Sequence, residues 1–347
     1  MSRRLLASLY SCIGYPILLS NCSVATIRRC AVPSLPAGWR KLEGVSNSMT
    51  SPDIVVVLNP KAGRYRAIRH KGTLQNLLEQ VSRRTGLTWR IVQTSRPGQA
   101  TELARQAAEE GASIVVAAGG DGTCGEVANG IIGTPARLGV LPLGTGNDFA
   151  RCAGIGENLQ IAVENLFTGK PRRIDLGSVA GRYFINVAGC GLDAAVAKRV
   201  NQGFRFLHGT AAYVAALFQT ILTFKPVSMR ITIDGEEQHL NALLCTVANT
   251  QSYGGGMRIA PYAQIDDGLL DVCIVKAVNK LEFVSVFPRV YSGTHITHPC
   301  FLMHTARRVH VESTPPVPVL VDGDVMGTTP VEFTVHPGAI EVILPVK

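Results

Sequence analysis

A glycine-rich loop in the first half of the chain carries residue types that can hold a phosphate. The loop Gly119-Gly120-Asp121-Gly122-Thr123 follows an apolar run and precedes a helical stretch. Glycine lets the main chain approach a phosphate closely, and a helix N-terminus presents backbone N–H groups to an anion. An acidic residue there makes sense if Mg²⁺ lies between it and the phosphate, or if it takes a proton from a hydroxyl. The alternative is a plain turn in which Asp121 caps the helix.

Two further polar glycine loops follow other apolar runs. Asn59-Pro60-Lys61-Ala62-Gly63 comes after the run Ile54–Leu58, and Gly144-Thr145-Gly146-Asn147-Asp148 comes after Leu138–Leu141. Ligands in open α/β sheets bind at the carboxyl ends of the strands. We therefore expect all three loops to meet at one crevice, with Lys61 either touching a phosphate or solvated.

Alternating apolar runs and helical stretches predict the architecture that positions these loops. From residue 53 to about 170, strands alternate with helices, which indicates an open, mostly parallel α/β domain. After about residue 175, short strands separated by turn residues indicate an antiparallel sandwich or barrel. We predict an α/β domain over residues 52–170 and a β-sandwich domain over residues 171–347. Residues 1–48 are expected to be a disordered leader or a mis-called start, with a targeting segment as the alternative.

Composition narrows the partners and the compartment. The formal net charge is +9, which suits nucleotide phosphates or an anionic membrane surface, although solvated basic faces would give the same charge. Aromatic residues make up 6% of the chain and do not alternate with the basic runs, so we expect no nucleic-acid partner. The nine cysteines form no CxxC pairs, which favours a reducing cytoplasm.

The three loops, in this order, resemble the catalytic domain of the diacylglycerol kinase and sphingosine kinase superfamily, closest to the soluble bacterial diacylglycerol kinases. The segments that carry the resemblance are NPKAG, GGDGTCGEVANG and LPLGTGNDFAR, with INVAGCGLDAAVA, PYAQIDDGLLDV and VDGDVMGTTP in the second half. The resemblance covers about residues 53–347 and implies an NAD kinase/diacylglycerol kinase-like fold. GGDG alone is less specific, because NAD kinases share it.

The resemblance also implies roles for single residues. ATP would be held by Asn59, Pro60, Lys61, Ala62, Gly63, Thr94, Gly119, Gly120, Asp121, Gly122, Thr123, Gly144 and Thr145. Asp121 and Asp148 would belong to a water-linked Mg²⁺ network around the γ-phosphate. The Asp-Gly-Glu of the family, whose glutamate accepts the proton of the lipid hydroxyl, is here Asp322-Gly323-Asp324. Asp324 keeps the carboxylate but is one methylene shorter.

A second, structural Mg²⁺ site is implied in the segment before residue 270. Its ligands would be the Asp267 carboxylate and the main-chain oxygens of Gln264 and Leu269. Oxygen ligands in a loop suit a hard cation. A plain Asp-Asp-Gly turn is the alternative.

Together with the residue patterns, the resemblance implies a cytoplasmic, peripherally membrane-associated lipid kinase that uses ATP and Mg²⁺ to convert diacylglycerol to phosphatidic acid. The α/β domain would be its ATP-binding catalytic domain and the β-sandwich its lipid-substrate domain. The alternatives are a kinase for another lipid alcohol or for NAD, and a non-catalytic nucleotide- or lipid-binding relative. A homodimer is left open. The segment Phe206–Phe224 lacks charged residues, but we interpret it as a packed helix because polar residues interrupt it. The G-x-G-x-x-A pattern at Gly189–Ala194 is set aside because a β-rich region is expected after it.

Overall fold

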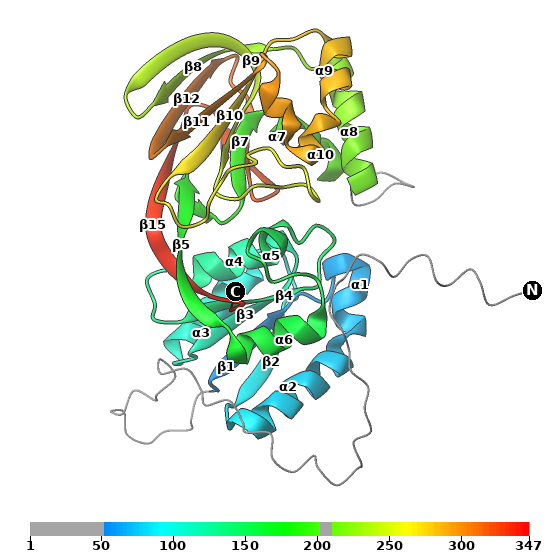
Figure 1. The fold of residues 1–347 in the computed structure, drawn as a ribbon, viewed down its shortest axis with the longest axis vertical. Helices are drawn as coiled ribbons and strands as arrows, with labels where there is room; N and C mark the ends of the chain where they lie inside the picture. Colours follow the sequence, from blue (N-terminus) through cyan, green and yellow to red (C-terminus); the bar gives the residue numbers. More distant parts are fainter. Residues whose placement is uncertain (1–51, 202–209, 347) are drawn as a thin grey trace, which may run out of the picture. The chain divides into compact units, whose positions relative to one another are not determined.

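The computed structural model describes residues 52–201 and 210–346, and its first part alternates parallel strands with helices (Figure 1). The strands β1 (Ile54–Leu58), β2 (Trp89–Gln93), β3 (Ile114–Gly119) and β4 (Arg137–Pro142) lie in the order β2-β1-β3-β4. The helices are α1 (Ala62–Arg69), α2 (Lys71–Thr85), α3 (Gln99–Glu109), α4 (Asp121–Ile131), α5 (Asp148–Cys152) and α6 (Leu159–Thr168). Every residue of β1 and β3 is buried, as expected for parallel strands covered on both faces. We call residues 52–168 the α/β half.

The second part is a largely antiparallel β structure, which we call the β half (residues 187–328). Its strands are β7 (Val187–Gly191), β8 (Val227–Ile233), β9 (Glu236–Ala248), β10 (Leu270–Lys276), β11 (Phe301–Ala306), β12 (Arg308–Thr314), β13 (Pro318–Val321) and β14 (Asp324–Thr328). Its helices are α7 (Leu192–Asn201), α8 (Thr210–Thr223), α9 (Lys280–Val286) and α10 (Arg289–Ser292), with a 3₁₀ turn at Thr294–Thr297. The predicted fold class, an α/β domain followed by a β-sandwich domain, is confirmed.

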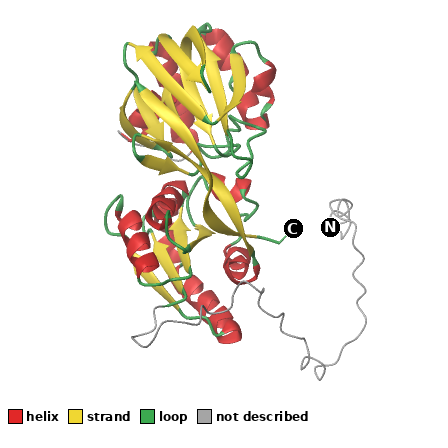
Figure 2. Cartoon of the chain, turned by 90° about the vertical axis from the view of Figure 1, so that its left-hand side faces the viewer, coloured by secondary structure: helices red, strands yellow, loops and turns green. Residues whose placement is uncertain are grey.

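Two long strands connect the halves (Figure 2). β5 (Lys170–Val179) pairs antiparallel with β15 (Val331–Leu344) over most of its length, and also with the short β6 (Arg182–Phe184). The first residues of β15 pair with β12 of the β half, whereas Val342 pairs in parallel with Leu138 of β4. The predicted β-sandwich domain over residues 171–347 includes the whole of this last strand. Its second part instead extends the parallel sheet of the α/β half, so one sheet runs through both halves.

Two local predictions differ from the structure. The run Tyr183–Val187, whose residues predict a single strand, is divided into β6 and β7, because the N–H groups of Ile185 and Asn186 donate to the Asp322 carboxylate instead of to a neighbouring strand. The helix α7 directly follows β7, where we had expected strands to dominate.

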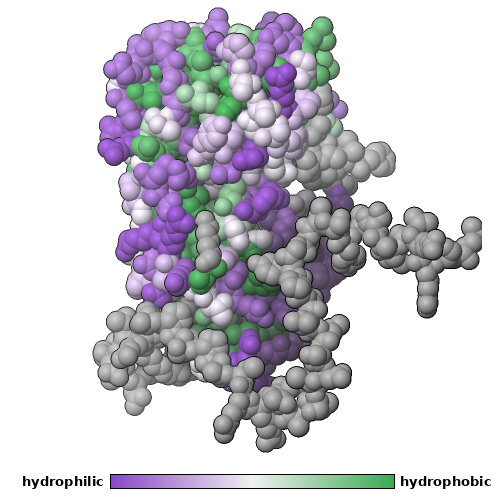
Figure 3. All heavy atoms as spheres, viewed as in Figure 1, coloured by the Kyte–Doolittle hydropathy of each residue, from purple (hydrophilic) through white to green (hydrophobic). Residues whose placement is uncertain are grey.

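The predicted leader at 1–48 lies wholly outside the described residues, and the uncharged segment at 206–224 lies partly outside them. Within it, α8 packs Ala216, Leu217 and Ile221 into the core of the β half, as predicted for a packed helix. No helix in the described ranges is long and apolar enough to cross a membrane. The molecular face in Figure 3 intersperses apolar with polar residues.

Candidate active site

The three predicted loops meet at the carboxyl ends of the parallel strands. We call residues 59–63 the first loop, residues 119–123 the central loop and residues 144–148 the third loop. The backbone N–H of Asn59, just after β1, donates to the Ala118 carbonyl of β3 at 3.0 Å. The Asn59 side-chain amide donates to the Thr123 hydroxyl of the central loop at 3.2 Å. A Cβ placed on Gly63 would lie 2.3 Å from the Leu143 carbonyl oxygen, so the first loop also touches the third. The sequence had predicted this convergence from the order of strands and loops.

The central and third loops pack backbone against backbone. A Cβ on Gly144 would lie 2.3 Å from the Cα of Gly120, so no side chain fits between the two chains. The helix α4 begins at Asp121, directly after Gly120, and leaves its first N–H groups without partners inside the helix. Close glycine backbones beside a helix N-terminus form a site that favours an anion.

Asp121 is the partly buried acid at the start of α4. Its Oδ1 accepts the N–H of Phe149 at 2.9 Å, which links the central loop to the third. Its Oδ2 faces Gly146, where an added Cβ would lie 3.0 Å away. Burial and the negative charge of Asp148 raise the pKa of the Asp121 carboxyl. A cation beside Oδ2 would favour the charged carboxylate, so Asp121 is suited to hold a divalent metal ion.

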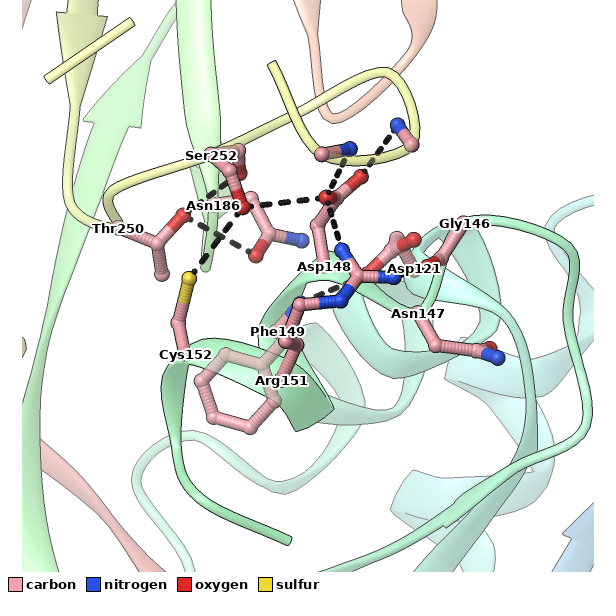
Figure 4. Close-up of polar contacts among 12 residues, drawn as sticks. Asp121, Gly146, Asn147, Asp148, Phe149, Arg151, Cys152, Asn186, Thr250 and Ser252 are labelled. Carbon is pink, nitrogen blue, oxygen red and sulfur yellow. Dashed lines mark hydrogen bonds and ion pairs between the residues drawn. The ribbon is translucent and has the colours of Figure 1, made fainter. Parts of the chain in front are cut away.

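Asp148 is buried and its carboxylate is fully engaged (Figure 4). It accepts hydrogen bonds from Arg151 (2.9 Å), from the Ser252 hydroxyl (3.1 Å) and from the N–H groups of Gly255 (2.7 Å) and Gly256 (2.8 Å). A carboxylate offers about four lone-pair sites. The contacts therefore make Asp148 a brace between the third loop and the β half, and its membership of a Mg²⁺ network stays a prediction.

The other predicted nucleotide residues lie at the same edge of the sheet. Thr94 directly follows β2, and its N–H donates to the Leu58 carbonyl at 3.0 Å. The side chains of Lys61 and Thr145 are exposed, as befits groups that would contact a bound ligand rather than the core. Their roles toward ATP stay predictions.

The turn that carries the predicted base packs against α4. Asp322 is half-buried beside Gly125, where an added Cβ would lie 2.8 Å from its Oδ2. Burial raises the pKa of Asp322 to about 6, although the N–H groups of residues 185–187 donate to its carboxylate at 2.9–3.1 Å. Asp324 is exposed and ion-paired with Arg182 at 2.8 Å. The sequence predicts Asp324 as the candidate base. It gives no sign that Asp322 braces the turn on α4 or that Arg182 pairs with Asp324.

The predicted structural metal site is a turn on the β half. Gln264 and Asp267 are exposed, and Asp267 Oδ1 accepts the N–H of Leu269 at 3.0 Å. Burial, and then the charge of Asp267, raise the pKa of Asp271 to about 6, so two carboxylates lie close enough to repel each other. A cation would relieve this repulsion, and the oxygen donors suit Mg²⁺. Among the residues that the structure describes, no cluster of three or more His, Cys, Asp or Glu side chains could hold a metal.

An apolar pocket lies between the sheet of the β half and its helices. Its walls include Leu217 of α8, Leu244 of β9, Phe283 of α9 and Phe287, which directly follows α9. One wall residue is Asp193 of α7, whose pKa burial raises to about 6. The walls of the pocket are therefore mostly apolar side chains.

Comparison with known proteins agrees with this geometry. The diacylglycerol kinase catalytic domain matches residues 53–179, and the YegS C-terminal NAD kinase beta sandwich-like domain matches residues 186–344. A diacylglycerol kinase of Bacillus subtilis is 33% identical over 293 residues, which cover 84% of this chain and 95% of that protein. A diacylglycerol kinase of Mycobacterium tuberculosis is 33% identical over 253 residues, which cover 71% and 81% of the two chains.

A crystal structure of a diacylglycerol kinase from Bacillus anthracis shares the fold. Its TM-score is 0.68 at 24% sequence identity, and the match covers 86% of this chain and 98% of that one. The matched domains, the two relatives and the shared fold span both halves of the molecule. The chain therefore belongs to the diacylglycerol kinase family.

Proposed function

We propose that this chain is an ATP-dependent lipid kinase that transfers the γ-phosphate of ATP to the hydroxyl of diacylglycerol and forms phosphatidic acid. The observation that carries the proposal is the convergence of three glycine loops on Asp121 at the N-terminus of α4. Membership of a kinase family supports phosphoryl transfer, and the names of the relatives support diacylglycerol as the acceptor.

ATP phosphates would bind at the backbone of the central and third loops, with Asn59 and Lys61 on one side and Thr94 beside the nucleoside. Phosphoryl transfer depends on positioning and on neutralisation of charge more than on covalent chemistry. Mg²⁺, when bound, would neutralise the charge of the transferring phosphate. Asp121 would hold it through Oδ2, because Oδ1 already accepts the Phe149 N–H.

Asp324 would accept the proton of the lipid hydroxyl as that oxygen bonds to the γ-phosphorus and the bond to the β-phosphate oxygen breaks. A positioned base contributes about 10²–10⁴-fold to rate. The turn that carries Asp324 is braced on α4 through Asp322, so the base and the phosphate loop are mechanically linked. Asp322 itself is half-buried, and its carboxylate already accepts the N–H groups of residues 185–187, so it is not the candidate base.

The apolar pocket supports a lipid acceptor. Its mostly apolar walls suit a part of an acyl chain better than a polar acceptor such as NAD. We also propose that the enzyme acts in the cytoplasm at an anionic membrane surface, which its net charge of +9 would attract.

A transfer assay tests the proposal. Purified protein would be incubated with Mg²⁺ and γ-labelled ATP against diacylglycerol, monoacylglycerol, a sphingoid base and NAD in separate reactions. We expect label in phosphatidic acid, at least about 10²-fold less with Asp121→Asn, and wild-type rates with Glu237→Gln, which changes an exposed β9 carboxylate. Label in NAD or in another lipid would show that this molecule, and not diacylglycerol, is the acceptor. If no acceptor is labelled, the result would favour the alternative, a non-catalytic nucleotide- or lipid-binding relative.

A further inference from the structure

Arg182 of β6 holds the carboxylate of Asp324 in place through an ion pair. Its Nη2 donates to Asp324 Oδ2 at 2.8 Å, and its Nη1 lies 3.3 Å from the sulfur of Met326. The Arg182 side chain is 23% exposed and that of Asp324 is 59% exposed. Arg182 is therefore the anchored member of the pair, and Asp324 is the member that solvent or a substrate can reach.

The strand that carries Arg182 is bound directly to α4. The Asn129 side chain of α4 accepts the N–H of Tyr183 at 3.0 Å and donates to the Tyr183 carbonyl at 2.8 Å. Both backbone groups of the residue next to Arg182 are thus held by the helix that begins at Asp121. These two hydrogen bonds therefore fix the Arg182 guanidinium relative to the central loop at the start of α4.

The turn that carries Asp324 rests on the same face of that helix. Asp322 packs against Gly125, which lies one helical turn before Asn129, and positions four apart share a face. The Asp322 carboxylate also accepts three N–H groups from residues 185–187, just after the strand of Arg182. Arg182 and the 322–324 turn are therefore cross-linked to each other and to α4.

We infer that Arg182 is a positioning residue that holds Asp324 Oδ2 so that Oδ1 faces the lipid hydroxyl; the inference rests on the proposed function. Within the described residues, Oδ1 of Asp324 has no hydrogen-bond partner. An exposed ion pair contributes little to stability, because solvent screens it. A fixed orientation, by contrast, matters directly to a proton transfer. The pair should therefore affect turnover much more than folding.

A double-mutant cycle tests this role. The variants are Arg182→Met, Asp324→Asn and the double variant. For each one, kcat and KM for ATP are measured with the acceptor lipid, and Tm is measured separately. We expect Arg182→Met to lower kcat about 10- to 100-fold, a part of what a positioned base supplies, with KM for ATP within about twofold. In the Asp324→Asn background the same change should lower kcat less than about twofold, because the residue that Arg182 orients is already disabled.

Two further variants separate orientation from folding. Arg182→Lys keeps a positive donor and should recover part of kcat. Arg230→Met breaks a similar exposed Arg–Glu pair, between β8 and β12, and should leave kcat and KM at wild-type values.

Three outcomes would overturn the inference: an unchanged kcat in Arg182→Met, an equal fold-loss in both backgrounds, or a loss that Arg182→Lys does not relieve while Tm falls. A wild-type protein that phosphorylates no lipid would refute the proposed function itself, and with it this role. The two failures are distinguishable because only the second appears without any substitution.

Discussion

The substitution Asp148→Asn tests whether Asp148 braces the two halves or binds metal. The change is nearly isosteric, so an amide oxygen in place of Oδ1 can still accept from Arg151, Ser252 and Gly256. The new NH₂ group would replace Oδ2, which lies 2.7 Å from the backbone nitrogen of Gly255. Two donors would then face each other, and the contacts would lose their charge assistance.

The size of the effect follows from these contacts. A buried donor left without an acceptor costs about 1–3 kcal/mol, and hydrogen bonds to a charged group are worth about 1.5–3 kcal/mol. Because Asp148 is 2% exposed, little water can replace the lost acceptor. We expect Asp148→Asn to lower the free energy of unfolding by about 2–4 kcal/mol. The loss should be present without any metal or nucleotide.

Urea unfolding of the metal-free protein measures this loss, and kinetics at varied Mg²⁺ measures the alternative. The matched control is Glu157→Gln, because Glu157 also pairs with Arg151 but is 52% exposed, and it should change stability by less than about 1 kcal/mol. If Asp148→Asn unfolds at the same urea concentration as the wild type but needs far more Mg²⁺ for activity, the hypothesis of a brace is wrong and Asp148 acts as a metal ligand.

Three other substitutions have defined outcomes. Gly144→Ala should abolish nucleotide binding in a calorimetric titration, because its Cβ would lie 2.3 Å from the Cα of Gly120; retained binding would contradict the close packing of these loops. Gly125→Ala should lower kcat and reduce stability by about 1–3 kcal/mol, because the methyl group displaces the Asp322 carboxylate; unchanged kcat would mean that the 322–324 turn need not rest on α4. Burial raises the pKa of Asp193 from 3.8 to about 6, so the folded protein binds this proton more tightly than the unfolded chain does. The resulting stabilisation is full below about pH 4 and is lost as the pH rises through about 6. Asp193→Asn should therefore gain about 1–3 kcal/mol relative to wild type between about pH 4 and pH 7, and a difference independent of pH would show that Asp193 does not titrate in this range.

The nucleotide loops were predictable because their signals are local. Apolar runs such as Ile54–Leu58 end directly in glycine and polar residues, and parallel strands place such endings at one edge. The contact of Asn59 with Thr123 follows from that rule, although the two residues are 64 positions apart. Strand order and periodicity therefore sufficed for the fold class and for the convergence of the loops.

The braces were not predictable, because their partners are distant and leave no pattern in the sequence. Asp148 is held by Ser252, which lies 104 positions away in an irregular segment, and Asp324 pairs with Arg182, which lies 142 positions away. The path of β15 was missed for a related reason. Its alternation of apolar and polar residues suits pairing in either half, so only the paired partner, Leu138, reveals that its end joins the α/β half.

The course of β15 has a consequence for synthesis on the ribosome. The nucleotide-binding sheet is built mainly from residues 54–142, yet the edge of β4 is completed only by Val342 and its neighbours, and Arg137 pairs with Glu341 at 2.9 Å. While the intervening two hundred or so residues are translated, at about 5–20 residues per second, that edge stays open. An open strand edge is a template for unwanted pairing. The nascent protein is therefore expected to need shielding by a chaperone until the segment near residue 342 leaves the exit tunnel.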